Sequence, residues 1–137
     1  MHDVNLFAVL VAGVVPMVIG ALWYGPIFGK RWMALMETTE EELREGFNPV
    51  KTHGVGFVLA LVTAFVIAQL VAEVSPESGG SAMVGVHVAL MALVAFVLPV
   101  SHQSVTFEGR KAGLAWLNVA YNGVALIGQA VVIALWR

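Results

Sequence analysis

The chain lacks cysteine, and only 12% of its 137 residues are charged. The absence of cysteine excludes disulfides, thiolate metal ligands and cysteine nucleophiles. A soluble domain has roughly 25% charged and about 45–50% apolar residues, whereas 59% of this chain is hydrophobic. Because a small soluble fold cannot cover so much apolar surface, the composition indicates a protein that lies in lipid.

An excess of basic residues is also missing, since the formal net charge is −2. Nucleic acid is therefore not an expected partner. The sequence contains no glycine-rich phosphate loop, no GxSxG, no HExxH and no paired carboxylates within an apolar run. We accordingly expect no enzymatic activity, no cofactor and no metal.

Four long apolar runs take the place of the missing charge, over residues 4–28, 52–74, 82–106 and 112–136. A helix needs roughly 20 residues to cross the hydrocarbon of a bilayer, and unbroken runs favour helices over barrel strands. The sequence predicts an all-α fold, a single integral membrane bundle of four transmembrane helices over residues 1–137. The turn-like stretch from Ser78 to Ser81 places the start of the third helix near Ala82.

Lysine and arginine are concentrated in two of the connections. They are Lys30, Arg31, Arg44 and Lys51 after the first run, Arg110 and Lys111 after the third, and Arg137 at the C-terminus. Loops rich in Lys and Arg stay in the cytoplasm. Six basic residues against one predict a multi-pass protein with both termini outside.

The first basic loop contains a short helix signal. Thr39 and Glu42 match a capping box, and Gly46 suits the position after a helix C-terminus. We expect a short cytoplasmic surface helix between the first two spans. Either it is a solvated linker or it docks a partner.

Small residues recur every fourth position in the first two runs, a spacing that lets helix backbones approach closely. They are Ala8, Ala12, Pro16 and Gly20 in the first, and Gly56, Ala60, Ala64, Ala68 and Ala72 in the second. We expect both faces to pack against helices of the same chain or of a second copy. Kinks are expected at Pro16 and Pro99, and a helix end at Gly25-Pro26.

Polar side chains within the runs form two groups by depth. Candidates for a ligand site or pore at the cytoplasmic side are His53, His102, Asn118, Tyr121 and Asn122, with Ser101, Gln103 and Ser104 beside them and Trp23 and Tyr24 at the same level. The outer group comprises Gln69, Glu73, His87 and Gln129. Such groups usually face a bundle interior or a cavity.

Three interpretations of these polar residues stay open. They form hydrogen bonds between helices, or they line a site for a small molecule or ion, or the histidines His53, His87 and His102 hold a metal or haem. No HxxxH or HxxE spacing supports the third. We expect His87 to be a hydrogen-bonded packing residue.

Two segments are distinctive: residues 23–32, WYGPIFGKRW, and residues 107–110, FEGR. Together with the Thr-Thr-Glu-Glu-Glu loop and Tyr121, they make the chain resemble the bacterial membrane family catalogued as domain of unknown function 1761. The resemblance covers essentially the whole chain and implies a small four-span inner-membrane protein with no established activity. A histidine often follows the tyrosine of the last span in that family, whereas this chain has Asn122, so the resemblance carries no essential histidine to this position.

These observations favour a structural or accessory subunit of the bacterial inner membrane. Its expected partners are the lipid bilayer and either other membrane subunits or further copies of itself. The first alternative is a transporter or channel for a small solute or ion that uses the cytoplasmic-side polar residues, and the second is a histidine-ligated metal or haem protein.

Overall fold

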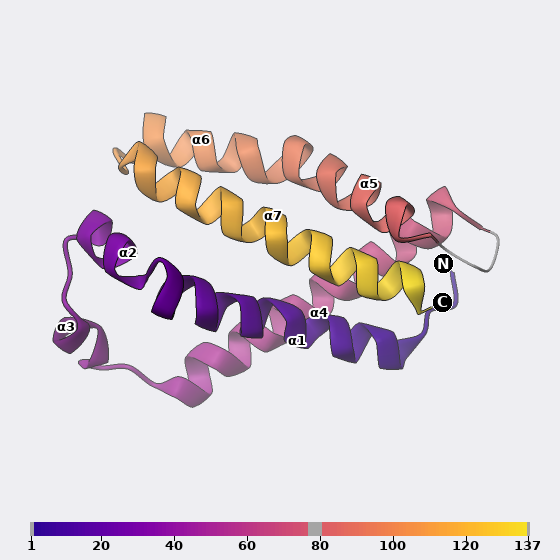
Figure 1. Cartoon of the computed structure of the whole chain (residues 1–137), viewed down its shortest axis with the longest axis horizontal. Helices are drawn as coiled ribbons and strands as arrows, with labels where there is room; N and C mark the ends of the chain where they lie inside the picture. Colours follow the sequence, from indigo (N-terminus) through magenta and orange to yellow (C-terminus); the bar gives the residue numbers. More distant parts are fainter. Residues whose placement is uncertain (1, 77–80, 137) are drawn as a thin grey trace.

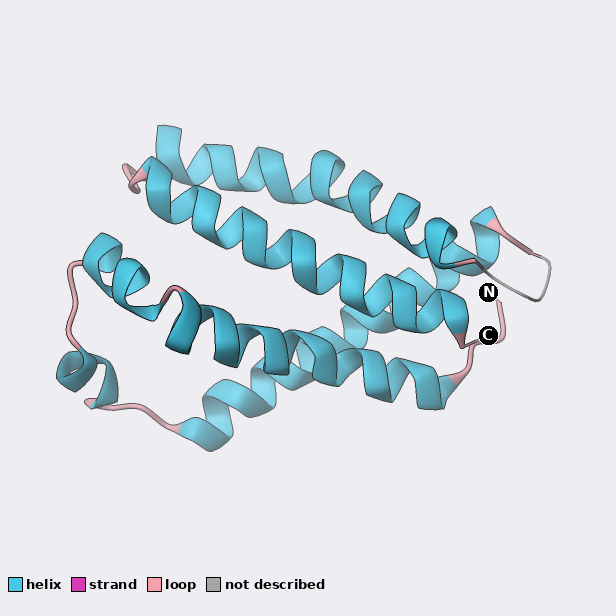
Figure 2. Ribbon diagram, viewed as in Figure 1, coloured by secondary structure: helices cyan, strands magenta, loops and turns pink. Residues whose placement is uncertain are grey.

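The computed structural model describes residues 2–76 and 81–136, and these ranges contain helices and no strand (Figure 2). The elements are α1 (Leu6–Leu22), the π-helical turn η1 (Trp23–Ile27), α2 (Gly29–Met36), α3 (Glu40–Arg44), α4 (Pro49–Val74), α5 (Ala82–Ala92), the π-helical turn η2 (Leu93–Val97), α6 (Leu98–Thr106) and α7 (Ala112–Leu135). Four stretches are long and apolar enough to cross a membrane: Leu6–Ile27, Pro49–Val74, Ala82–Thr106 and Ala112–Leu135. The predicted all-α fold with four membrane spans is confirmed.

Side-chain caps fix where three of the spans begin. The Asn5 side chain accepts two backbone N–H groups at the start of α1, and Asn48 and Ser81 each accept one at the starts of α4 and α5. Pro49 occupies the first position of α4, where no N–H is needed. The expected start near Ala82 is found, while residues 78–80 of the predicted turn lie outside the described residues.

The last helix is the central one (Figure 1). α7 contacts α5, η2 and α6 on one side and α1 and α4 on the other. Both termini lie at one end of the bundle, which we call the terminal end. The connections between α2 and α4 and between α6 and α7 lie at the opposite, loop end, where the Lys111 ammonium pairs with the Glu37 carboxylate at 3.0 Å.

The terminal end holds the closely packed core. Ala12, Ala64 and Ala130 are fully buried there, and α5 approaches α7 so closely that a Cβ at Gly85 would lie 2.5 Å from the Ala130 carbonyl oxygen. Close approach of backbones is how membrane helices gain dispersion energy. The small-residue faces of the first two spans, α1 and α4, pack against helices of the same chain.

The loop end is open by comparison. In α4, residues 49–59 are exposed apart from half-buried Gly56 and Phe57, and α6 has no buried residue. In α2, Gly29 alone is buried. The bundle is thus closed around the termini and splayed around the loops.

Proline lies in or beside the irregular turns of the first and third spans. The first span ends at Ile27, directly after the predicted helix end at Gly25-Pro26. Past a turn at Phe28 the chain forms α2, a helix that the sequence did not predict. Gly29 allows this, because a Cβ there would lie 2.8 Å from the Tyr24 carbonyl oxygen. In the third span the irregular turn is η2, and Pro99 follows it in the first turn of α6.

The surface helix α3 forms where the capping signal predicted it. The Thr39 hydroxyl accepts the Glu42 N–H at 3.2 Å, and Gly46 has φ +69°. The second half of the capping box is replaced, because the Glu42 carboxylate accepts from the Thr38 hydroxyl instead of from the Thr39 N–H.

One polar side chain joins three spans in the middle of the bundle. Gln129 on α7 is 1% exposed, and its Nε2 donates to the Ala12 and Ala60 carbonyl oxygens, each at 3.1 Å. Pro16, four residues after Ala12, has no N–H to give that carbonyl. The amide of Gln129 therefore supplies the donor that proline removes from α1.

Replacing Gln129 with Leu should lower the free energy of unfolding by about 1–2 kcal/mol, since it leaves the Ala12 carbonyl unsatisfied in lipid. Pro16→Ala restores the helical N–H, so Gln129→Leu should cost less in that background. Unfolding in mixed micelles by increasing dodecyl sulfate, followed by circular dichroism, measures both differences. An equal loss in the two backgrounds contradicts the pairing.

Candidate functional site

Three aromatic rings stand side by side at the loop end. Tyr24 of η1 lies between Trp32 of α2 and Tyr121 of α7, with ring centroids 5.3 and 5.2 Å away. The Tyr24 hydroxyl donates to the Asn118 side-chain oxygen at 2.7 Å. The turn through η1 is what brings Tyr24 and Trp32, eight residues apart, onto one wall.

Tyr121 ties this wall to α1. Its hydroxyl donates to the Pro16 carbonyl oxygen at 3.0 Å. Gly20 leaves room for it, because a Cβ there would lie 3.3 Å from the hydroxyl oxygen. Asn122 turns its amide back to the Asn118 carbonyl of its own helix, at 2.9 Å. Tyr121 and Gln129 therefore both attach α7 to backbone carbonyls of α1.

A cleft lies between this wall and the splayed half of α4. It consists of a cavity of about 500 Å³ and an adjoining one of about 290 Å³, which share Pro16, Met17 and Tyr121. We call the two together the loop-end cleft. Its other lining residues are Gly20, Ala21, Tyr24, Trp32, Thr52, His53 and Asn118 in the larger cavity and Gly56, Leu59, Ala60, Thr63, Asn122, Ala125, Leu126 and Gln129 in the smaller.

The chemistry of this lining suits binding more than proton transfer. It includes hydroxyls, carboxamides and one imidazole, His53, but no carboxylate, lysine or arginine. The His53 ring packs edge-on against Phe47, 5.8 Å between centroids. The lining residues can form hydrogen bonds with a ligand. The charged side chains of the loops are not among them.

The structure does not bring His102 into the cleft. Its ring nitrogen lies 3.2 Å from the Thr106 hydroxyl, and with Ser101 and Trp116 it lines a separate groove of about 310 Å³ between α6 and α7. The single layer expected from depth alone is therefore divided by α7. Trp23 also lies apart from the Tyr24 wall, packed on Phe28 at 4.7 Å.

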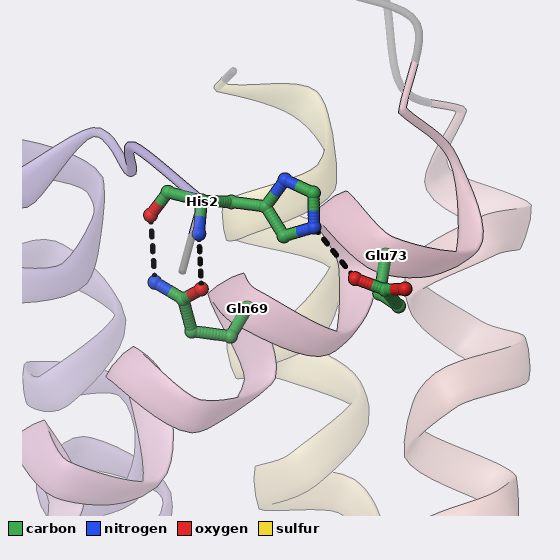
Figure 3. A network of polar contacts seen from close by, with 3 residues as sticks. All are labelled: His2, Gln69 and Glu73. Atoms are coloured by element: carbon green, nitrogen blue, oxygen red, sulfur yellow. Dashed lines mark hydrogen bonds and ion pairs between the residues drawn. The ribbon is translucent and has the colours of Figure 1, made fainter.

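The outer polar candidates separate as well. Gln69 receives the His2 N–H and donates to the His2 carbonyl, each at 2.8 Å, and the Glu73 carboxylate lies 2.6 Å from the His2 imidazole (Figure 3). Gln129 is buried deeper, and His87 is exposed beside Met91. The expectation that His87 is a hydrogen-bonded packing residue is wrong, because it points away from the other helices.

The three candidate histidines lie in three separate places. His53 lies in the cleft, His102 in the other groove and His87 on the outer surface of α5. Within residues 2–76 and 81–136, no three His, Asp or Glu side chains gather closely enough to hold a metal ion. This arrangement does not fit the histidine-ligated alternative.

Sequence reasoning missed one participant, His2. It precedes the first apolar run and carries no pattern of its own, yet it fastens the N-terminal segment to the end of α4. Nearby, the Asn5 amide donates to the Trp136 carbonyl at 3.0 Å. Only the prediction that both termini lie on the same side of the membrane hinted at this cluster.

A comparison with family models matches residues 7–134 to the family described as "Protein of unknown function (DUF1761)". No curated protein and no solved structure matches the chain. The match extends from the first turn of α1 to the last turn of α7 and includes both distinctive segments. The resemblance is thereby confirmed, and the chain belongs to the DUF1761 family.

Proposed function

We propose that this protein is a non-enzymatic structural or accessory subunit of the bacterial inner membrane. The observation that carries the proposal is the pair of hydrogen bonds of Gln129. This buried side chain on α7 donates to backbone carbonyls of α1 and α4 and so holds three spans together. Tyr121 is used in the same way on the Pro16 carbonyl. Polar groups inside a bundle that bond to backbone favour a scaffold over a reaction centre.

The proposed orientation places both termini on the outer side of the inner membrane. The Lys111–Glu37 pair joins the two basic loops at one end, and the Asn5–Trp136 hydrogen bond joins the termini at the other. Since the loops carry six of the seven Lys and Arg residues, the positive-inside rule assigns the loop end to the cytoplasm.

The third span offers the surface for self-association. Both small-residue faces are already used within the chain, whereas α5, η2 and α6 pack mainly on α7. Their outer face exposes large apolar side chains, among them Met91, Val94 and Phe96. A second copy that packs there would cover lipid-exposed surface without disturbing the bundle.

Single-cysteine variants test the orientation, because the native chain has no cysteine. In intact cells, a membrane-impermeant maleimide should label Asp3→Cys and Pro76→Cys, which are exposed at the terminal end. Glu41→Cys and Glu108→Cys should be labelled only after the membrane is permeabilised. Labelling of the two loop positions from outside contradicts the orientation.

Cross-linking tests self-association. Oxidation of membranes that contain Val94→Cys, 61% exposed on η2, should give a covalent dimer, whereas Val62→Cys, 56% exposed on α4, should remain monomeric. A monomer at both positions, together with a monomeric mass for the detergent-solubilised native chain, rules out this interface.

The loop-end cleft favours one second candidate, a transporter or channel for a small ion. It reaches from the loop end to Gln129 in the middle of the bundle. On this hypothesis, liposomes with the native chain conduct Na⁺ or K⁺, Asn122→Leu lowers the flux, and His102→Ala in the separate groove leaves it unchanged. Equal flux with Asn122→Leu and the native chain excludes the cleft as a path.

A further inference from the structure

The loop-end cleft is about as long as one bilayer leaflet is thick. Its α4 wall runs from Thr52 to Thr63, and eleven residues at about 1.5 Å each give about 16 Å. Half of a hydrocarbon core of about 30 Å is about 15 Å. The cleft therefore has the length of one extended acyl chain that lies along α4.

The wall changes character along that length. In its deep part Met17, Leu59 and Leu126 supply apolar surface, and Gly56 leaves space between α4 and α1. The polar side chains there, Thr63, Asn122 and Gln129, donate to backbone carbonyls of the bundle. The mouth of the cleft is formed by Trp32, with Thr52 and His53 opposite. Apolar depth below an aromatic and polar mouth is the profile of the membrane interface, and it matches an amphipathic molecule.

Three basic residues are chain neighbours of the residues at the mouth. Lys30 and Arg31 directly precede Trp32, Lys51 directly precedes Thr52, and all three are exposed. None forms an ion pair with another residue of the described ranges. The basic residues elsewhere in the loops are paired: Arg44 with Glu40, Arg110 with Glu108 and Lys111 with Glu37.

No glutamate of the same loop is among the residues that line the cleft. These glutamates lie between residues 37 and 45, beyond the cluster at Lys30 and Arg31. Glu37 and Glu40 are in the pairs just named. Glu41, Glu42 and Glu45 form no ion pair within the described residues and lie on or after α3, away from the residues that line the cleft. Unpaired cations at the headgroup level attract anionic lipids.

We propose that the loop-end cleft binds one anionic phospholipid, with one acyl chain along α4 and its headgroup among Lys30, Arg31 and Lys51. The second acyl chain stays in the bilayer. That the cytoplasmic leaflet supplies this lipid rests on the proposed orientation. Recognition combines the length of the groove with the charge at its mouth.

Native mass spectrometry of the detergent-solubilised full chain tests the charge requirement. With equal amounts of phosphatidylglycerol and phosphatidylcholine of identical acyl chains, the native chain should retain one phosphatidylglycerol in preference. Lys30→Gln/Arg31→Gln/Lys51→Gln should weaken that preference at least about tenfold, given about fivefold per basic residue. The charge-matched Arg44→Gln/Arg110→Gln/Lys111→Gln should keep it.

A pair of glycines on α4 tests the groove. A Cβ at Gly56 would lie 3.5 Å from the Met17 methyl group, whereas a Cβ at Gly54 has nothing within 4 Å. Gly56→Leu should fill the cleft and abolish retention of both lipids, and Gly54→Leu should retain lipid like the native chain. Circular dichroism verifies that both variants are helical. The triple glutamine variants change only exposed residues, so they test lipid binding without altering the packing of the core.

Four results overturn the proposal: equal retention of the two lipids by the native chain, equal loss in both triple variants, lipid retention by Gly56→Leu, or a lipid-free dimer that Gly56→Leu dissociates and Gly54→Leu keeps, which assigns the cleft to a second copy. The assay contains no oriented bilayer. A reversed orientation in the maleimide experiment therefore leaves the lipid result standing, and loss of lipid selectivity leaves the orientation standing.

Discussion

The bundle depends on the match between Pro16 and Gln129. Proline in the first span frees the Ala12 carbonyl, and a carbonyl without a donor is costly in hydrocarbon. The Gln129 amide donates a hydrogen bond to this carbonyl and another to the Ala60 carbonyl, each at 3.1 Å. Three helices must therefore hold one rotation and one depth relative to each other for this side chain to be satisfied, which fixes α7 at the centre.

This constraint also explains why the two halves of the bundle differ. Beyond Gln129 toward the termini, alanines such as Ala12, Ala64 and Ala130 allow the helices to close without space between them. Toward the loops, large side chains, above all Tyr24, Trp32 and Tyr121, hold the helices apart, and α4 diverges. The cleft is thus a consequence of which residues replace the alanines toward the loop end of each span.

The sequence predicted the features that depend on local pattern. Apolar runs gave the four spans, Thr39 and Gly46 gave α3, and the small-residue spacing identified faces that the structure buries. It did not predict the features that depend on rotation and lateral order of helices: His102 shares its depth with His53, yet α7 stands between them. Helix α2 was also missed, because no capping side chain precedes Gly29 to signal the start of a new helix. Much of the candidate site could therefore be grouped by depth, but its division into two grooves could not.

The long sequence separation of the polar contacts has a consequence for biogenesis. Gln129 meets Ala12 across 117 residues, and Asn5 meets Trp136 across 131. During synthesis, the first span is made long before the last one. The Ala12 carbonyl therefore lacks its hydrogen-bond donor, the Gln129 amide, until α7 has been translated. Until α7 is in place, neither the Ala12 nor the Ala60 carbonyl has this donor, so α1 and α4 reach their final packing only after the last span has been inserted.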